Sequence, residues 1–157
     1  AHIRSDTGWI TDLTPNRSMF EQNEIRKFRD VTDGLSHTIL QYESAGRAAL
    51  YVQGRTAVSP SWWTQEYKAW AGHFNSGWLY PYQVELDPNT GNPNVTWFVG
   101  TDIINVSNLY GAPYAFHTGG MQISLADGSV RFMTENIDMD ILSALTSIDG
   151  HEVVGEF

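Results

Sequence analysis

The sequence predicts an α+β domain built mostly from antiparallel β-sheet. Short apolar runs with strand character recur along the chain, turn-forming residues separate them, and one amphipathic helical segment stands near the C-terminus. A length of 157 residues fits one domain, and an apolar share of 41% is enough to fill a core. We therefore expect a single domain over residues 1–157, with a Trp- and Tyr-rich insertion over residues 53–112.

Short elements are predicted along the N-terminal two thirds. Ile25, Phe28 and Val31 recur every third residue, which fits a short helix or a strand. A turn is predicted over residues 87–91, where Asp, Pro, Asn and Gly cluster. The segments with strand character are residues 38–42, 48–52, 96–99 and 102–106.

A β-hairpin is predicted in the C-terminal third. The dipeptide Asp127-Gly128 separates two segments in which apolar and polar residues alternate, as in a hairpin with a tight turn. A two-residue loop would pair Leu125 with Val130, and cross-strand partners share a face. This register predicts four apolar side chains on one face: Ile123, Leu125, Val130 and Phe132.

A helix and a closing strand are predicted after the hairpin. Asp138 is the expected N-cap of the helix, and Gly150 is its expected C-terminal stop. The apolar stripe that would cover the hairpin consists of Ile141, Leu142, Leu145 and Ile148. Residues 152–155 then read as a short closing strand.

Composition excludes several classes of function. Nine basic and eighteen acidic residues give a formal charge of −9, which disfavours nucleic acid and anionic membrane surfaces as partners. The absence of cysteine excludes disulfides, thiolate metal sites and cysteine nucleophiles. No apolar run approaches the roughly 20 residues of a membrane-spanning helix.

A spaced motif surrounds the predicted hairpin. His117 is followed, after nine intervening residues, by Asp127-Gly128, and Gly119-Gly120 stands directly before the first strand. This arrangement resembles a bacterial family of prepilin-like proteins of unknown function.

The resemblance extends to a second segment. Asp33-Gly34, within residues 30–43, is similar to the second signature of the same family. The resemblance covers residues 25–43 and 113–157. The chain departs from the usual family pattern at Thr118, which replaces Pro, and at His37, which replaces Asn.

The resemblance implies a pilin-like or pseudopilin-like precursor, in which a long apolar N-terminal helix precedes a globular head. That helix is missing from this sequence, so we expect the chain to be the head or most of it. The implied function is non-enzymatic: assembly with like subunits or with a secretion apparatus. The implied location is the cell surface, the extracellular space or the periplasm, with membrane contact only through the missing helix.

His117 has a structural and a chemical interpretation. We expect Gly119-Gly120 to allow an abrupt change of chain direction and His117 to fix it by hydrogen bonds. A catalytic pair of His117 and Asp127, with Ser124 as nucleophile, is disfavoured because the intervening strand spans roughly 20 Å. A metal-binding or catalytic role for His117 is the alternative.

The two Asp-Gly dipeptides are predicted to be turns. Asp33 is expected to close a turn at Gly34 as Asp127 does at Gly128, because aspartate bonds locally to its own backbone. The alternative is a paired-carboxylate site formed by Asp33 and Asp30.

Aromatic side chains are concentrated in residues 61–82. These rings are expected to form core or interface, and the alternative is stacking on sugar rings, which would make the chain a carbohydrate-binding module. The candidate residues for either role are Trp62, Trp63, Tyr67, Trp70 and Trp78.

Calcium is the one cofactor that the sequence suggests. Asp87 and Asn89 have the spacing of a calcium-binding loop, but the loop lacks an oxygen-bearing side chain at its fifth position and Glu at its twelfth. A plain turn that ends at Gly91 is therefore the favoured interpretation.

Overall fold

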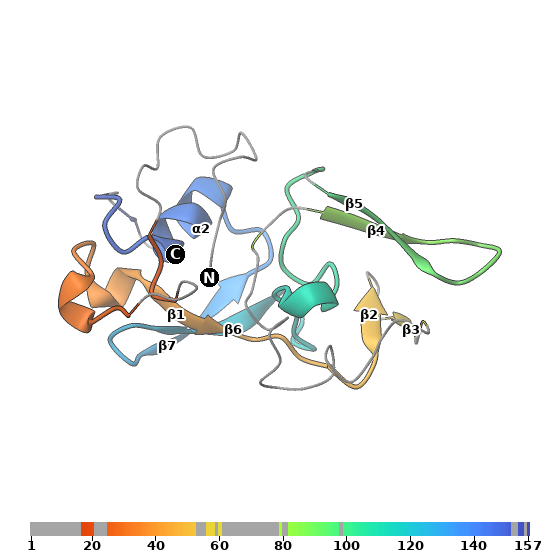
Figure 1. Cartoon of the computed structure of the whole chain (residues 1–157), viewed down its shortest axis with the longest axis horizontal. Helices are drawn as coiled ribbons and strands as arrows, with labels where there is room; N and C mark the ends of the chain where they lie inside the picture. The colour runs from red at the N-terminus through yellow and green to blue at the C-terminus, as the bar shows by residue number, and fades with distance from the viewer. Residues whose placement is uncertain are drawn as a thin grey trace. The chain divides into compact units, whose positions relative to one another are not determined.

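The computed structural model contains two compact units. The first comprises Ala1–Tyr42, Gln122–Met133 and Ile137–Phe157, and the second comprises Glu43–Met121 and Thr134–Asn136. The elements are labelled in Figure 1. The structure describes residues 17–20, 25–52, 56–58, 60, 79, 82–97, 99–151, 154–155 and 157.

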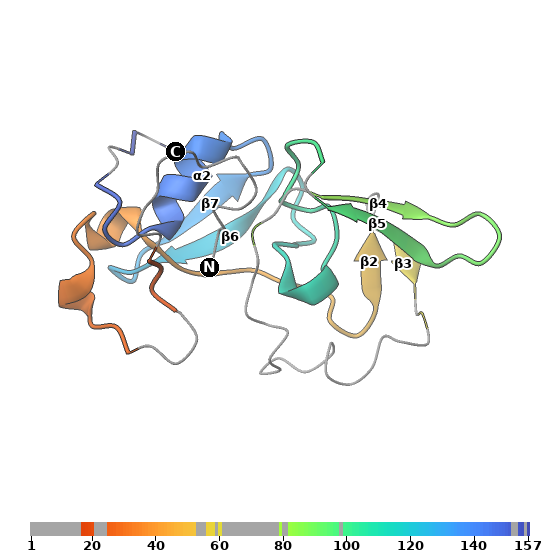
Figure 2. The same cartoon turned by 45° about the horizontal axis from the view of Figure 1, so that its top comes forward.

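The first unit contains an antiparallel sheet with the strand order β1-β6-β7. Figure 2 shows β6 and β7 of this sheet side by side. β1 pairs with β6 with Ile39 opposite Leu125, and a bulge shifts the register before Gln41. The strands are β1 (Ile39–Tyr42), β6 (Gly120–Leu125) and β7 (Val130–Thr134). Short 3-10 helices at Phe28–Asp30 and Leu35–His37 precede β1.

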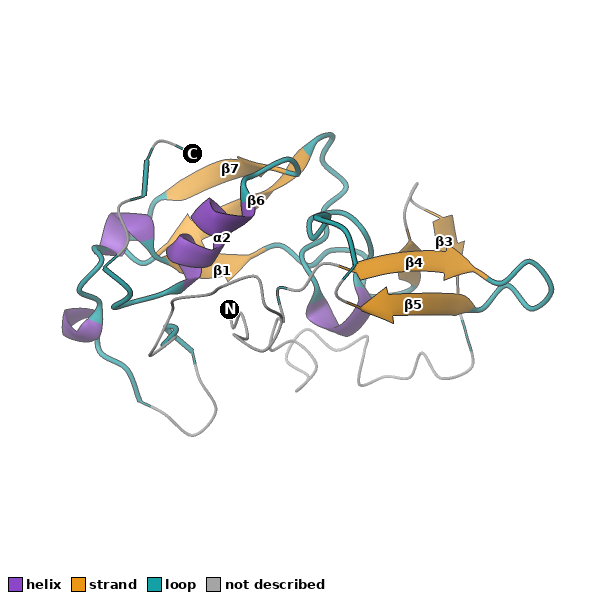
Figure 3. Cartoon of the chain, turned by 90° about the horizontal axis from the view of Figure 1, so that it is seen from above, coloured by secondary structure: helices purple, strands orange, loops and turns teal. Residues whose placement is uncertain are grey.

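Helix α2 (Met139–Thr146) lies over one face of this sheet (Figure 3). The Asp138 carboxylate accepts hydrogen bonds from the N–H groups of Asp140, at 2.8 Å, and Ile141, at 3.3 Å, so the predicted N-cap is confirmed. The buried side chains of helix and sheet include Ile39, Ile123, Leu125, Leu142 and Leu145. Within the described ranges, no helix combines the length and apolar character that crossing a bilayer requires.

The predicted C-terminal end of α2 is wrong. The helix ends at Thr146 and Ser147 is extended, so Gly150 is not the stop. The Ile148 carbonyl accepts backbone hydrogen bonds from Asp33 and the residue before it, at 3.2 and 2.7 Å. These bonds give the backbone after Ser147 a partner outside the helix, which explains the early end.

The closing strand predicted over residues 152–155 is not observed in the part that the structure describes. Val154 and Gly155 lie in no strand, and Glu152 and Val153 fall outside the described residues. Close to this segment, the guanidinium of Arg131 lies 5.0 Å from the centre of the Phe157 ring.

The β6–β7 hairpin is present, but its loop has three residues where two were predicted. Leu125 N–H donates to the Ser129 carbonyl, and Gly128 N–H donates to the Leu125 carbonyl, both at 2.9 Å. Gly128 has φ +87°, the left-handed conformation that completes a type I turn with a bulge. The glycine of Asp-Gly suits this three-residue loop as well as the predicted two-residue loop, so the dipeptide alone does not determine the loop length.

The extra loop residue reverses the predicted facing of β7. Val130 is 65% exposed and Phe132 is 43% exposed, whereas Met133 is only 2% exposed. Because strand side chains alternate, a shift of one residue moves a whole set to the other face. The prediction that Val130 and Phe132 join the core is therefore wrong, and Met133 takes that place.

The second unit contains two separate two-stranded ladders and a short 3-10 helix, Leu109–Gly111. The ladders are β2 (Leu50–Val52) with β3 (Thr56–Val58), and β4 (Tyr82–Leu86) with β5 (Pro93–Trp97). The turn predicted over residues 87–91 joins β4 to β5.

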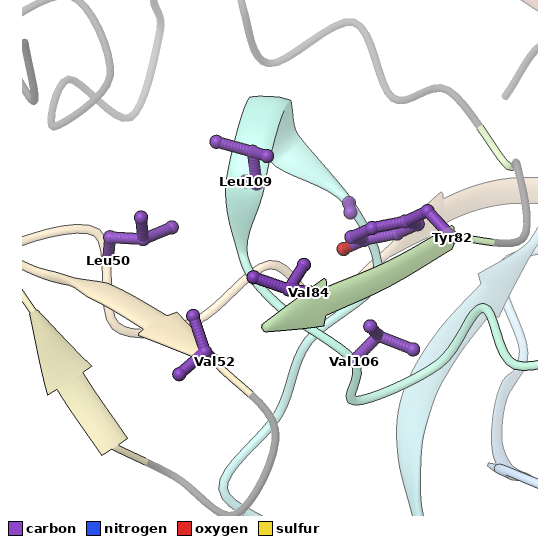
Figure 4. Close-up of a cluster of buried hydrophobic side chains, with 7 residues drawn as sticks. Leu50, Val52, Tyr82, Val84, Val106 and Leu109 are labelled. Carbon is purple, nitrogen blue, oxygen red and sulfur yellow. The ribbon is translucent and has the colours of Figure 1, made fainter. Parts of the chain in front are cut away.

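A small apolar cluster forms the core of the second unit. Figure 4 shows side chains from β2, from β4 and from the segment that follows β5 gathered in one cluster. Its buried members are Leu50, Val52, Tyr82, Val84, Val106, Leu109 and Ala112. The strand predicted over residues 102–106 is wrong, because Asn105 has φ +63° and its N–H bonds to the Pro113 carbonyl.

Asn108 connects this core to the loop before β2. Its side chain is fully buried; Nδ2 donates to the carbonyls of Ala45, Gly46 and Ala49, at 3.0–3.1 Å, and Oδ1 accepts from Tyr51 N–H at 2.9 Å. One carboxamide thus bonds to four backbone groups of a segment that has few ladder bonds of its own, with its two N–H hydrogens shared among three carbonyls.

The β7 register predicts unequal costs for matched substitutions. Met133→Thr should lower the free energy of unfolding by about 3 kcal/mol, because it opens the core and buries a hydroxyl. Val130→Thr, at an exposed strand position, should change it by less than about 0.5 kcal/mol. Urea unfolding measures the free energy of unfolding of both variants. A larger decrease for Val130→Thr than for Met133→Thr would contradict this register and favour the one with a two-residue loop.

Asn108→Ala should destabilise the protein by about 3 kcal/mol, because four backbone groups lose their buried partner. Asn94→Ala is the control, since Asn94 is an exposed residue of β5, and we expect a change within about 0.5 kcal/mol. Thermal and chemical unfolding of both variants provides the comparison. Equal stability of the two variants would contradict the role given to Asn108.

Candidate functional site

A polar cavity of about 420 Å³ lies beside His117 in the second unit. Its walls come from residues 102–106, from residues 114–119 and from the turn at 135–136. The polar side chains among its lining residues are Asp102, Asn105, Tyr114, His117, Thr118, Glu135 and Asn136. The sequence pointed to His117 alone among these side chains.

Asn105 holds the walls of the cavity together. Its Nδ2 donates to the Gly120 carbonyl at 3.3 Å and to Glu135 Oε2 at 3.2 Å, and its Oδ1 accepts from Ala115 N–H at 2.8 Å. The positive φ of Asn105, which asparagine tolerates better than most residues, accompanies this arrangement. The carboxylate of Glu135 is thereby oriented by a neutral donor.

His117, which lines the cavity, is paired with Glu43. Its Nε2 lies 3.3 Å from Glu43 Oε1, and the two side chains are 52% and 34% exposed. Glu43 is held there by its backbone, because its carbonyl accepts from Tyr114 N–H at 3.0 Å. A neutral imidazole hydrogen-bonds to this carboxylate in one tautomer, and a protonated one forms an ion pair with it.

The two glycines of the motif lie where the chain turns into β6. Gly119 has φ +80°, a conformation that glycine adopts at little cost, and its carbonyl accepts from Glu135 N–H at 2.9 Å. Gly120 is buried and is the first residue of the strand.

Asp33 bonds to a distant segment, although the sequence pattern suggested a local turn. Its nearly buried carboxylate accepts from the N–H groups of Gly150 and His151, at 2.8 and 2.9 Å. Gly34, with φ +99°, takes the chain into the following 3-10 helix. The second signature therefore connects to the segment after α2 within the first unit.

Asp127 bonds within its own turn. Its Oδ1 accepts from Ser129 Oγ at 2.7 Å and from Ser129 N–H at 2.9 Å. These two hydrogen bonds, the hydroxyl first, lower the pKa of the Asp127 carboxyl, and Arg131 adds a smaller effect in the same direction. Desolvation opposes them only in part.

Among the described residues, no base bonds to Ser124, the nucleophile of the disfavoured catalytic arrangement. Ser124 lies on β6, and its Oγ is buried with no hydrogen-bond partner among the described residues. A serine nucleophile needs a base within hydrogen-bond reach.

Asp87 and Asn89 form a turn stabilised by the aspartate. Asp87 Oδ1 accepts from the N–H groups of Asn89, at 2.7 Å, and Thr90, at 3.1 Å, and these bonds lower the pKa of Asp87. Gly91, with φ +67°, closes the loop. In the part of the chain that the structure describes, no group of three His, Asp or Glu side chains could hold a metal ion.

The aromatic candidates cannot be placed. Trp62, Trp63, Tyr67, Trp70 and Trp78 all lie outside the described residues. The choice between core, interface and sugar stacking therefore stays open for them.

Comparison with known proteins assigns the family. Residues 4–140 match the family described as "Protein of unknown function (DUF1559)", and this range includes both Asp-Gly signatures. The chain belongs to the DUF1559 family. No curated protein and no solved structure matches it. The expectation of a family of unknown function is confirmed, and the pilin assignment stays a prediction.

Several residues in and beside the cavity of this DUF1559 chain belong to no sequence pattern that predicts a site. Glu43 and Glu135 are 92 positions apart in the numbering, and neither belongs to a local motif that marks a site. Asn105 stands in a segment that was expected to be a strand. The residue type offered a local hint, because asparagine adopts a positive φ more readily than most residues, as Asn105 does.

The Asp127 contacts predict a measurable titration. Ser129→Ala removes the hydroxyl donor and keeps the backbone donor, so the pKa of Asp127 should rise toward its ordinary value. The lowered pKa stabilises the folded turn above the unfolded-state pKa, and this contribution is lost as the pH falls through the folded-state pKa. Carboxyl NMR titration gives the pKa directly, with Ser124→Ala as control. An unchanged pKa in Ser129→Ala would refute the assignment.

Proposed function

We propose that the chain is a non-enzymatic assembly subunit, the soluble head of a pilin-like or pseudopilin-like protein that works at the cell surface, outside the cell or in the periplasm. The resemblance of the His117 to Gly128 segment to prepilin-like proteins supports this proposal. Membership of a family of unknown function is compatible with it. An antiparallel sheet covered on one face by a helix is also compatible with such a head.

The observation that carries the proposal is the use of the signature carboxylates. Asp33 accepts two backbone N–H groups of a distant segment, and Asp127 accepts two donors from Ser129. Both aspartates therefore satisfy groups of the chain itself. Side chains used in this way shape a scaffold, which favours a structural role for the signatures over a chemical one.

The outer face of β7 is the assembly surface that we propose. Val130 and Phe132 are large apolar residues that lie two positions apart on the strand, and both are exposed. β7 is also at one end of the strand order in its sheet. Exposed apolar residues on an edge strand are suited to contact with another subunit.

Carbohydrate binding and hydrolysis are the two alternative functions. Carbohydrate binding by the Trp-rich segment has no support from the described residues, because the rings lie outside them. Hydrolysis would need an activated nucleophile or water. Among the described residues, the cavity offers an imidazole paired with Glu43, and Ser124 Oγ has no hydrogen-bond partner.

Sedimentation velocity over a range of protein concentrations tests the assembly surface. We expect the chain to associate as its concentration rises and the double variant Val130→Asp, Phe132→Asp to stay monomeric, because burying two charges opposes contact. Gln83→Asp, at an exposed position of β4, is the control and should associate like the parent. Circular dichroism confirms that each variant is folded.

Antibodies raised against the chain give an independent test in native cells. Immunogold labelling of surface filaments or of a secretion complex would support the proposed location. A chain that stays monomeric at every concentration, together with label confined to the cytoplasm, would contradict the proposed function.

A further inference from the structure

The lining of the cavity beside His117 suits a ligand that is rich in hydroxyl groups. Pockets for drug-sized ligands are mostly apolar, whereas carboxylates, carboxamides, two hydroxyls and an imidazole line much of this one. These groups include both acceptors and donors, and a sugar hydroxyl needs one of each. The volume of about 420 Å³ lies in the range that small-molecule sites occupy.

The charge of the lining residues favours some classes of ligand over others. Asp102 and Glu135 supply two carboxylates among the described lining residues, and His117 is the single group there that can become cationic. Glu43 lies 3.3 Å from His117 and adds a further negative charge behind it. Anionic ligands are therefore disfavoured, and a protonated amine on the ligand is favoured.

The Glu135 acceptor is held in place before a ligand binds. Asn105 Nδ2 donates to Glu135 Oε2 at 3.2 Å, and Glu135 is one of the residues that line the cavity. The Glu135 backbone is fixed as well, since its N–H donates to the Gly119 carbonyl. Such preorganisation lowers the entropy lost on binding.

We propose that this cavity is a saccharide-binding site, with Glu135 and Asp102 as acceptors for the sugar, and that it prefers an amino sugar to a neutral one and a neutral sugar to an acidic one. The inference is independent of the assembly proposal, because it concerns the second unit and not β7. It is also independent of the Trp-rich segment, since none of those rings is among the described lining residues.

The experiment is an NMR titration of the whole chain with glucosamine, glucose and glucuronic acid, which share a pyranose ring and differ in charge. Amide shifts of Gly119, Glu135 and Asn136 report on the cavity. We expect saturable shifts at these amides and the tightest binding for glucosamine. Glucuronic acid should bind at least about tenfold more weakly than glucosamine, because its carboxylate meets two like charges.

Charge-removing variants assign the effect to the cavity. Glu135→Gln keeps an oxygen for the Asn105 donor and should weaken glucosamine binding about fivefold, with a smaller effect on glucose. Glu85→Gln removes the same charge from an exposed position of β4 in the same unit and should leave the affinity unchanged. The amide spectrum shows that each variant keeps its fold.

Three outcomes would overturn the proposal. The first is the absence of shifts at the cavity amides with every sugar at millimolar concentration. The second is saturable shifts confined to residues 61–82, which would assign the sugar to the aromatic segment. The third is an equal response to glucosamine in Glu135→Gln and Glu85→Gln.

Discussion

The need to satisfy backbone hydrogen bonds in irregular segments is the constraint on which this structure depends. Long stretches of the described chain belong to no strand or helix, yet much of this backbone is packed inside the protein. Buried N–H and C=O groups must find partners there. Asn108 supplies four such partners in the second unit, Asn105 supplies partners around the cavity, and Asp33 supplies two in the first unit. Polar side chains thus supply the backbone hydrogen-bond partners that strand ladders and helices supply in more regular proteins.

The sequence patterns were most informative where the interactions are local. The class of fold, β1, the cap at Asp138 and the turn before β5 depend on residues close in sequence, and all were predicted. The end of α2 was not predicted, because it depends on hydrogen bonds from Thr32 and Asp33 to Ile148, which lies more than a hundred residues further along the chain. The prediction of which β7 side chains face the core was wrong for a different reason. Asp-Gly fits loops of two lengths, and the alternation of apolar residues favoured the wrong one.

The candidate site illustrates the same limit. His117 stood out because of its spacing to Asp127, yet the structure brings it to Glu43 and to a cavity that also contains Glu135. These partners come from separate parts of the chain, so no spacing rule could have joined them. The motif therefore identified one residue of the cavity lining, and the other lining residues became apparent only in the structure. Membership of the DUF1559 family adds no role for these side chains, since the family is described as one of unknown function.

The bulged loop at Gly128 has an evolutionary consequence. With three residues between β6 and β7, the strand presents Met133 inward and Val130 and Phe132 outward. Deleting one loop residue would invert the strand, hiding its aromatic side chain and bringing Met133 to solvent. Related chains that lack the third loop residue would therefore present a different outer surface from nearly the same strand sequence. A single codon in this loop can thus change which side chains the outer face of the hairpin presents while the sheet itself persists.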